Sequence, residues 1–239
     1  KKTIVYGWSQ GGGATIAAAS LLDYQAQKGT AADNLQYLGY VALAPEDVAA
    51  VLPKLPADEA GANKLMKEFT AANVPNVFLF AHFMMGLWGT QAAYPDLKLT
   101  DVLTEEGAQV AEKLSSNKCV HVMADTFNYA YGDRYQSLVK PEPSNSLAWI
   151  KAFIDGSVKP VKPNAPVIIY WGTKDTAVPP VMHEIYQKQM CAMGANVSRI
   201  QLPGEQTHFA TPGVSAPMYL QWVKDRISGK PIENGCPKG

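Results

Sequence analysis

Short apolar runs recur along this chain, and they predict buried strands. The clearest runs lie at residues 3–6, 38–44 and 166–172, and a strand-like run follows at residues 196–202. The run at 166–172 has no polar alternation, as expected of a strand that is covered on both faces in a parallel sheet. Helical patterns separate these runs. The chain therefore predicts an α/β fold, a mostly parallel sheet with helices on both faces.

The pattern changes in the middle of the chain, where helical segments replace strands. A helix-rich insertion of this length between two strands predicts a cap or lid. We expect a core of residues 1–45 and 164–239 and a cap of residues 46–163. The informative segments of the cap are two helix-like stretches and one apolar stretch rich in Phe, Met and Trp, at residues 58–69, 104–114 and 76–89 respectively.

Composition narrows the classes of function. The chain has 239 residues, of which 47% are hydrophobic, so it can bury a sizeable core. Lys and Arg together number 21, as do Asp and Glu, and no basic stripe predicts a nucleic-acid partner. No segment reaches the ~18 uninterrupted apolar residues of a membrane span.

The three cysteines are too few for a disulfide scaffold. They are Cys119, Cys191 and Cys236, and none lies beside a histidine at zinc spacing. We therefore expect no metal and no cofactor. A bridge between Cys191 and Cys236 would pin the C-terminal tail, and reduced thiols are the alternative.

Residues 7–11 carry the strongest functional motif, Gly-Trp-Ser-Gln-Gly. A Gly-x-Ser-x-Gly sequence between a strand and a helix is the nucleophile elbow of α/β-hydrolases, a sharp turn that projects the serine oxygen. We expect Ser9 to be the nucleophile, with Gly7 and Gly11 placed where the two backbones crowd together. The backbone N–H of Gln10 is the expected oxyanion donor.

His208 is the expected base, because the acid and then the histidine follow the serine along the chain in this arrangement. It lies in a loop between the strand-like run at 196–202 and a helical segment at 217–227. Of the other three histidines, we expect His82 to be a packed or pocket-wall residue, and His121 and His183 to be structural or exposed.

Asp175 is the expected acid. It follows the apolar strand at 166–172, and an aspartate just past a strand end can reach a histidine from the next loop. The alternative role is a turn aspartate that caps the helix starting near Pro180. Three other carboxylates are rivals for the role of acid, namely Glu46, Asp47 and Glu205.

Three side chains are candidates for substrate contact. Trp8 precedes the nucleophile, and Phe83 and Leu87 lie in the apolar stretch of the cap. Such a stretch is suited to hold an acyl chain. The alternative interpretation is that it forms the cap's own core.

The start of the chain is unusual for this motif, because only eight residues precede Ser9. An α/β-hydrolase places several strands before the nucleophile strand, and soluble proteins avoid an unpaired apolar edge. We expect that these N-terminal strands are missing from the chain and that an upstream segment or fragment completes the sheet. The second oxyanion donor would lie there as well.

Taken together, these motifs resemble the secretory lipase family of α/β-hydrolases. The matching positions are residues 7–12, 14–15, 172–175 and 178–180, His208, residues 227–231 and Cys236. The resemblance implies secretion and hydrolysis of carboxylic esters, with the acyl chain held in the cap. It gives the nucleophile role to Ser9, the acid role to Asp175 and the base role to His208.

The expected protein is thus a secreted or periplasmic lipase or esterase for small-molecule esters or lipids, with contact to a lipid interface through the cap. One alternative is a serine peptidase of the prolyl oligopeptidase type, whose motifs follow the same order. The other is a non-catalytic binding protein on the same fold. The large insertion argues against the first, and the presence of all three triad residues argues against the second.

Overall fold

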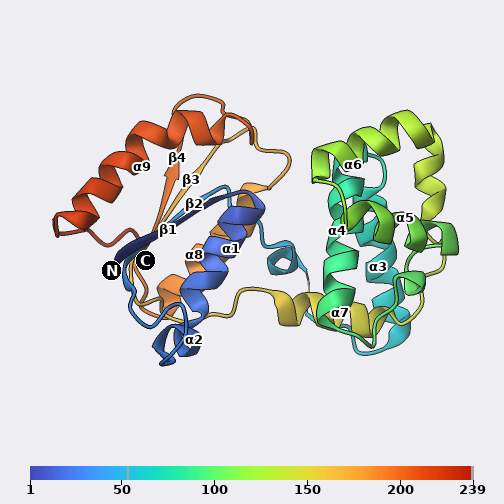
Figure 1. Cartoon of the computed structure of the whole chain (residues 1–239), viewed down its shortest axis with the longest axis horizontal. Coiled ribbons are helices and arrows are strands. Elements are labelled where there is room, and N and C mark those ends of the chain that lie inside the picture. The colour runs from blue at the N-terminus through green and yellow to red at the C-terminus, as the bar shows by residue number, and fades with distance from the viewer. Residues whose placement is uncertain (53, 238–239) are drawn as a thin grey trace. The chain divides into compact units, whose positions relative to one another are not determined.

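The computed structural model describes residues 1–52 and 54–237, and the chain forms two compact units. Unit 1 comprises Lys1–Leu52 and Ser157–Gly239, and unit 2 comprises Pro53–Gly156. Figure 1 shows that the sheet lies in unit 1 and that unit 2 is built from helices.

The described residues of unit 1 form four parallel strands in the order β1-β2-β3-β4. The strands overlap the four predicted runs and are β1 (Lys2–Trp8), β2 (Gln36–Leu43), β3 (Val167–Trp171) and β4 (Val197–Gln201). The register pairs Trp8 with Leu43, and Leu43 with Tyr170. The carboxyl ends of the strands therefore meet at one edge of the sheet, where loops can bring side chains together.

Both faces of this sheet are covered by helices, as the apolar runs predict. In β2, Tyr40 and Ala42 pack against α1 and α8, whereas Val41 and Leu43 pack on the opposite face, which α9 covers. All four side chains are fully buried. Figure 1 shows the two layers on either side of the strands. The helices of unit 1 are α1 (Gln10–Ser20), α2 (Leu22–Ala26), η1 (Val48–Val51), α8 (Pro180–Ala192) and α9 (Thr211–Ile227).

Helix α9 begins earlier than the sequence predicts. The helical pattern starts at Pro217, but the helix starts at Thr211 and contains Pro217 in its interior. The first turns of α9 contain polar residues that face the interior. Thr211 and Ser215 are fully buried, and the Ser215 hydroxyl donates to the Thr211 carbonyl oxygen at 2.7 Å. Because these buried hydroxyls are satisfied by carbonyl groups of the same helix, the buried face needs no apolar residues here. The hydrophobic pattern of the sequence therefore does not reveal the first turns of the helix.

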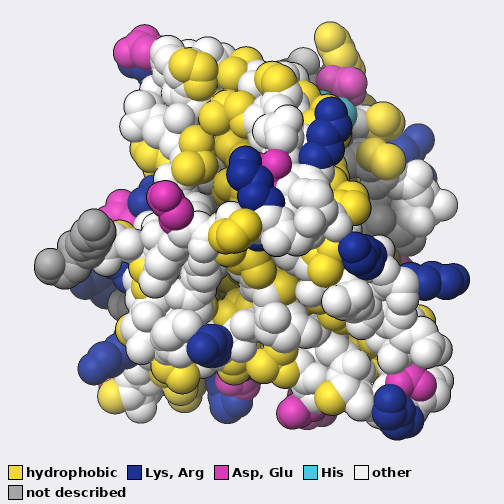
Figure 2. Space-filling view, turned by 90° about the vertical axis from the view of Figure 1, so that its left-hand side faces the viewer, with side chains coloured by type: hydrophobic (Ala, Val, Ile, Leu, Met, Phe, Trp, Pro, Cys, Tyr) yellow, Lys and Arg dark blue, Asp and Glu magenta, His cyan; other side chains and the backbone are white. Residues whose placement is uncertain are grey.

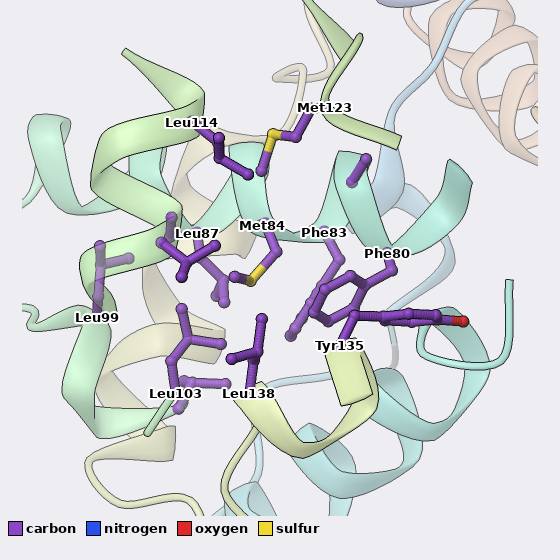
Figure 3. Close-up of a cluster of buried hydrophobic side chains, with 14 of the residues drawn as sticks. Phe80, Phe83, Met84, Leu87, Leu99, Leu103, Leu114, Met123, Tyr135 and Leu138 are labelled. Atoms are coloured by element: carbon purple, nitrogen blue, oxygen red, sulfur yellow. The ribbon is translucent and has the colours of Figure 1, made fainter. Parts of the chain in front are cut away.

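Unit 2 is a helical unit whose core surrounds the apolar stretch at residues 76–89. This stretch lies in α4, and Figure 3 shows its side chains among those of the neighbouring helices. Three helices begin at a side chain that accepts hydrogen bonds from the first turn, namely Asp58, Asn76 and Thr104. The helices are α3 (Glu59–Asn73), α4 (Val77–Ala93), η2 (Leu99–Asp101), α5 (Glu105–Ser115), α6 (Val120–Thr126), η3 (Phe127–Tyr131), η4 (Gly132–Leu138) and α7 (Ser146–Gly156).

The surface mixes residue types. On the face shown in Figure 2, basic and acidic side chains are interspersed among hydrophobic ones. Within the described residues, no helix combines the length and the hydrophobicity that crossing a membrane requires.

Glycines allow two close backbone approaches at the turn: β1 approaches α1 at Gly7, and α1 approaches the segment after β2 at Gly13. A Cβ atom at Gly7 would lie 2.0 Å from the carbonyl oxygen of Gly11, and one at Gly13 would lie 2.2 Å from the carbonyl oxygen of Glu46. A Cβ at Gly11 itself would meet no atom of the described residues within 4 Å. The expected crowding is confirmed for Gly7 and is wrong for Gly11, because Gly11 lies on the exposed side of α1 and contributes only its carbonyl group to the contact.

This difference between the two motif glycines can be tested. We expect Gly7→Ala to lower the free energy of unfolding by about 1–3 kcal/mol, since the added methyl group overlaps a backbone oxygen. Gly11→Ala serves as the matched control and should be neutral or stabilising by up to about 1 kcal/mol, because alanine favours helix over glycine. Urea unfolding of both variants measures the difference. Equal destabilisation of the two would contradict the contact geometry.

A disulfide joins α8 to the C-terminal tail. Cys191 and Cys236 are bonded across 45 residues of sequence, whereas Cys119 is free and exposed. Hydrogen bonds support the tail beside the bridge: Gly235 N–H donates to Asn196 Oδ1 at 2.8 Å. Of the two alternatives from the sequence, the structure therefore has the bridge.

We expect Cys236→Ser to destabilise unit 1 by about 2–4 kcal/mol, because closing a loop of this length removes entropy from the unfolded chain. Cys119→Ser is the matched control, and its free energy of unfolding should stay close to the wild-type value. Thermal and urea unfolding without reductant check both. A Cys236→Ser variant as stable as the wild type would argue that the bridge adds nothing to the fold.

Candidate active site

Ser9 lies at the turn between β1 and α1 in an unusual backbone conformation. Its φ is 59° and its ψ is −122°. A positive φ is uncommon for a residue with a side chain, and such conformations cost about 1–3 kcal/mol. Ser9 is the N-cap residue of α1, yet its side chain makes no capping hydrogen bond. Its hydroxyl is therefore left for another partner.

Three backbone hydrogen bonds hold this conformation. The Ser9 N–H donates to the carbonyl oxygen of Leu43 at 2.9 Å. The Ser9 carbonyl oxygen accepts from the N–H groups of Gly13, at 2.9 Å, and Glu46, at 3.2 Å. Strand β2, helix α1 and the segment after β2 thus hold the turn together.

The structure brings together the three residues that the sequence predicts for a triad. His208 Nε2 lies 2.8 Å from Ser9 Oγ, and His208 Nδ1 lies 2.7 Å from Asp175 Oδ2. Both Asp175 and His208 are buried, with 6% and 4% of their surface exposed. Ser9 comes from the end of β1, and the other two come from the loops after β3 and β4.

Asp175 is held by its own turn. Its Oδ1 accepts hydrogen bonds from the N–H groups of Ala177 at 3.0 Å and Val178 at 2.7 Å. An aspartate that bonds to backbone N–H groups two and three residues later is a familiar turn former. Asp175 does not cap α8, whose N-cap residue is Pro179 and has no side-chain cap. Its turn role and the acid role are compatible, since one oxygen serves the turn and the other faces His208.

A glycine allows the acid loop and the histidine loop to touch. A Cβ at Gly172 would lie 2.2 Å from the carbonyl oxygen of Gln206, and the Lys174 N–H donates to that same oxygen at 2.9 Å. These contacts hold the two loops at a fixed distance. Sequence reasoning did not identify Gly172 or Gln206 as supports of the site, because their proximity exists only once β3 and β4 are paired.

The rival carboxylates have other contacts. Asp47 accepts hydrogen bonds from the Ser157 hydroxyl and the Val158 N–H. Glu205 is mostly exposed and forms an ion pair with Lys174 at 3.5 Å. Glu46 contributes its backbone N–H to the turn at Ser9. Asp175 is the carboxylate hydrogen-bonded to His208.

The remaining histidines have contacts of their own. His183 is fully buried in α8, and Arg199 Nε donates to its Nδ1 at 3.0 Å. Burial, assisted by the nearby Arg199 charge, lowers the pKa of His183 to about 3, so its ring is neutral. His82 contacts the Phe78 carbonyl oxygen of its own helix at 2.9 Å. Phe78 also packs against His121.

The residues predicted as oxyanion donor and as substrate contacts lie in different parts of the chain's structure. Gln10 is the first residue of α1, where backbone N–H groups lack partners within the helix. Trp8 lies against His208. Phe83 and Leu87 are buried in the core of unit 2, as Figure 3 shows, and their burial favours the interpretation that the stretch is that unit's own core. Their contact with an acyl chain stays a prediction.

The described residues contain no cluster of three or more His, Cys, Asp or Glu side chains that could hold a metal ion.

Solved structures resemble the fold over nearly the whole chain. Candida antarctica lipase A in its closed state matches 99% of this chain and 51% of its own, with a TM-score of 0.68 and 22% identity. The rice cell wall degrading esterase LipA from Xanthomonas oryzae matches 96% of this chain and 59% of its own, with a TM-score of 0.65 and 13% identity. At these identities the likeness concerns the fold, and it confirms the predicted α/β-hydrolase class.

Sequence comparison gives the family. The secreted triacylglycerol lipases LIP2 and LIP4 of Malassezia globosa are 29% and 30% identical over 160 and 170 residues, which is 63% and 66% of this chain. The chain spans only about a third of the length of these relatives, 35% and 36%. The model of the secretory lipase family matches residues 70–235. Because this match covers more than half of the chain, the chain belongs to the secretory lipase family.

Proposed function

We propose that this protein hydrolyses carboxylic esters through an acyl-enzyme intermediate on Ser9. The observation that carries the proposal is the 2.8 Å contact between Ser9 Oγ and His208 Nε2, on a serine whose backbone projects it from a sharp turn. Membership of the secretory lipase family supports an ester as the substrate class. No observation favours the peptidase or the non-catalytic alternative.

In this proposal Asp175 sets the tautomer of His208. Its carboxylate accepts a hydrogen bond from the Nδ1–H of His208, which leaves the lone pair on Nε2 directed at the Ser9 hydroxyl. His208 takes the hydroxyl proton as Ser9 attacks the ester carbonyl, and returns it to the leaving alcohol. Water then enters by the same route, His208 acts as base again, and the carboxylic acid is released.

The negative oxygen of the tetrahedral intermediate needs hydrogen-bond donors. We assign one to the Gln10 backbone N–H, because it begins α1 next to the nucleophile. The helix also points its positive end at this position.

We base the proposed substrate class and the proposed secretion of the protein on its relatives. The Malassezia relatives are named secreted triacylglycerol lipases, so we propose a secreted enzyme that acts on lipid or other ester substrates. Contact with a lipid interface and an acyl chain held by the cap, which corresponds to unit 2, belong to the same proposal.

The triad assignment predicts a specific pattern of losses. In the full-length protein we expect Ser9→Ala to reduce hydrolysis of a nitrophenyl ester by about 10⁴-fold or more, because the nucleophile is gone. Asp175→Asn should cost roughly 10⁴-fold in turnover, because asparagine favours the wrong His208 tautomer. Glu205→Gln and Asp47→Asn are the matched controls and should retain activity within about tenfold.

Melting temperatures close to the wild-type value would show that the variants fold. A Ser9→Ala variant within tenfold of wild-type activity would refute the nucleophile assignment. Cleavage of an X-Pro anilide in preference to the ester would instead support the peptidase.

The proposed acyl contacts in unit 2 can be separated from a core role. Phe83 is 5% exposed and Leu87 is 1% exposed, so truncating either to alanine should destabilise the protein by about 2–5 kcal/mol. If Phe83 also binds the acyl chain, Phe83→Leu should shift the preference for ester chain length while destabilising the protein less than Phe83→Ala does, because it removes fewer buried atoms. Thermal melts and a series of esters on the same variants measure both. An unchanged preference would leave only the core role.

A further inference from the structure

Trp8 and Phe209 form a three-ring cluster with the imidazole of His208. The Trp8 and His208 ring centroids are 5.1 Å apart, and their planes differ by 31°. Phe209 meets His208 at 86° and 5.5 Å, and it meets Trp8 at 71° and 5.9 Å. The indole is thus closer to parallel with the imidazole than to perpendicular, whereas the phenyl ring stands across both.

The position of Trp8 is not explained by a hydrogen bond. Its indole nitrogen is buried and has no hydrogen-bond partner among the described residues. Leaving a buried donor unpaired is unfavourable. The indole also packs on the hydrophobic cluster of β2, β3 and α9, but the contact it makes with a chemically active group is the one with His208.

We propose that Trp8 is a positioning residue that acts through His208, its indole face stabilising the imidazolium that forms in each step of ester hydrolysis. This inference rests on the proposed function. A cation near an aromatic face is attracted by the ring quadrupole, and tryptophan is the strongest of the aromatic side chains in this respect. The proton that His208 takes from Ser9 creates such a cation 5.1 Å from the Trp8 ring, while Asp175 stabilises the same cation from Nδ1.

A substitution at Trp8 leaves the ionisable residues on the neighbouring loops and helices unchanged. Asp175 bonds to Nδ1, and on the adjoining loops Lys174 and Glu205 pair with each other. Glu46 follows β2, and His183 in α8 is neutral. A change of Trp8 alters none of these side chains.

The experiment compares Trp8→Phe and Trp8→Leu with the wild type in the full-length protein. We expect kcat/KM for a short nitrophenyl ester on its pH plateau to fall in the order Trp, Phe, Leu, by about two- to thirtyfold for leucine. The acid limb of the same pH profile should move to lower pH in the same order. The sign follows because a less stable imidazolium forms only at a lower pH, so His208 stays neutral and competent further into acid.

The two readouts are linked, because one interaction sets both. A tenfold loss on the plateau should accompany a shift of the acid limb of up to about one pH unit. Trp171→Leu is the matched control: Trp171 also ends a strand, but its ring contacts His183 instead of His208. Its acid limb should stay at the wild-type midpoint.

Two results would overturn the proposal. A lower plateau with an unmoved acid limb would mean that Trp8 acts by packing. A rise in KM that depends on ester chain length, again with an unmoved limb, would mean that it contacts substrate. NMR titration of the His208 ring in the wild type and in Trp8→Leu gives a readout besides activity. Identical titration curves for the two proteins would mean that this proposal is wrong. A wild type without esterase activity would mean instead that the proposed function is wrong.

Discussion

The positive φ of Ser9 is the constraint on which the candidate site depends. It turns the chain from β1 into α1 within one residue and frees the hydroxyl from the capping role that a serine at this position usually has. Such a conformation persists only where the surroundings hold it. Here β2 accepts its N–H, α1 and the segment after β2 donate to its carbonyl group, and Gly7 allows the backbones to meet.

The same edge of the sheet holds the other two members of the triad. Parallel pairing places the loops after β3 and β4 beside each other, and the contacts of Gly172 and Lys174 with Gln206 join them. Because Asp175 uses one oxygen for its own turn, the other is left to orient His208. The candidate site thus needs few dedicated residues once the backbone is in place.

Trp8 shows how one residue can belong to both the fold and the proposed chemistry. It ends β1 and packs on the face of the sheet that α9 covers, and the same ring lies against His208. A residue that is rigid for packing reasons costs no further entropy when it stabilises a charge. Trp8 can have both roles because it lies at the boundary between the hydrophobic core and the polar site.

The sequence by itself determined the class of fold and the four strands that the described residues form, and it singled out Ser9 and His208 as candidates, because each leaves a local signal: an apolar run, a turn motif, or a histidine in the loop after the last strand. It left open the Cys191–Cys236 bridge and the acid among four carboxylates, and it misplaced the start of α9 and the crowding at Gly11. Those depend on which segments face each other. Only the tertiary structure decides that, since distances between residues far apart in the chain arise from the packing of the sheet and its helices.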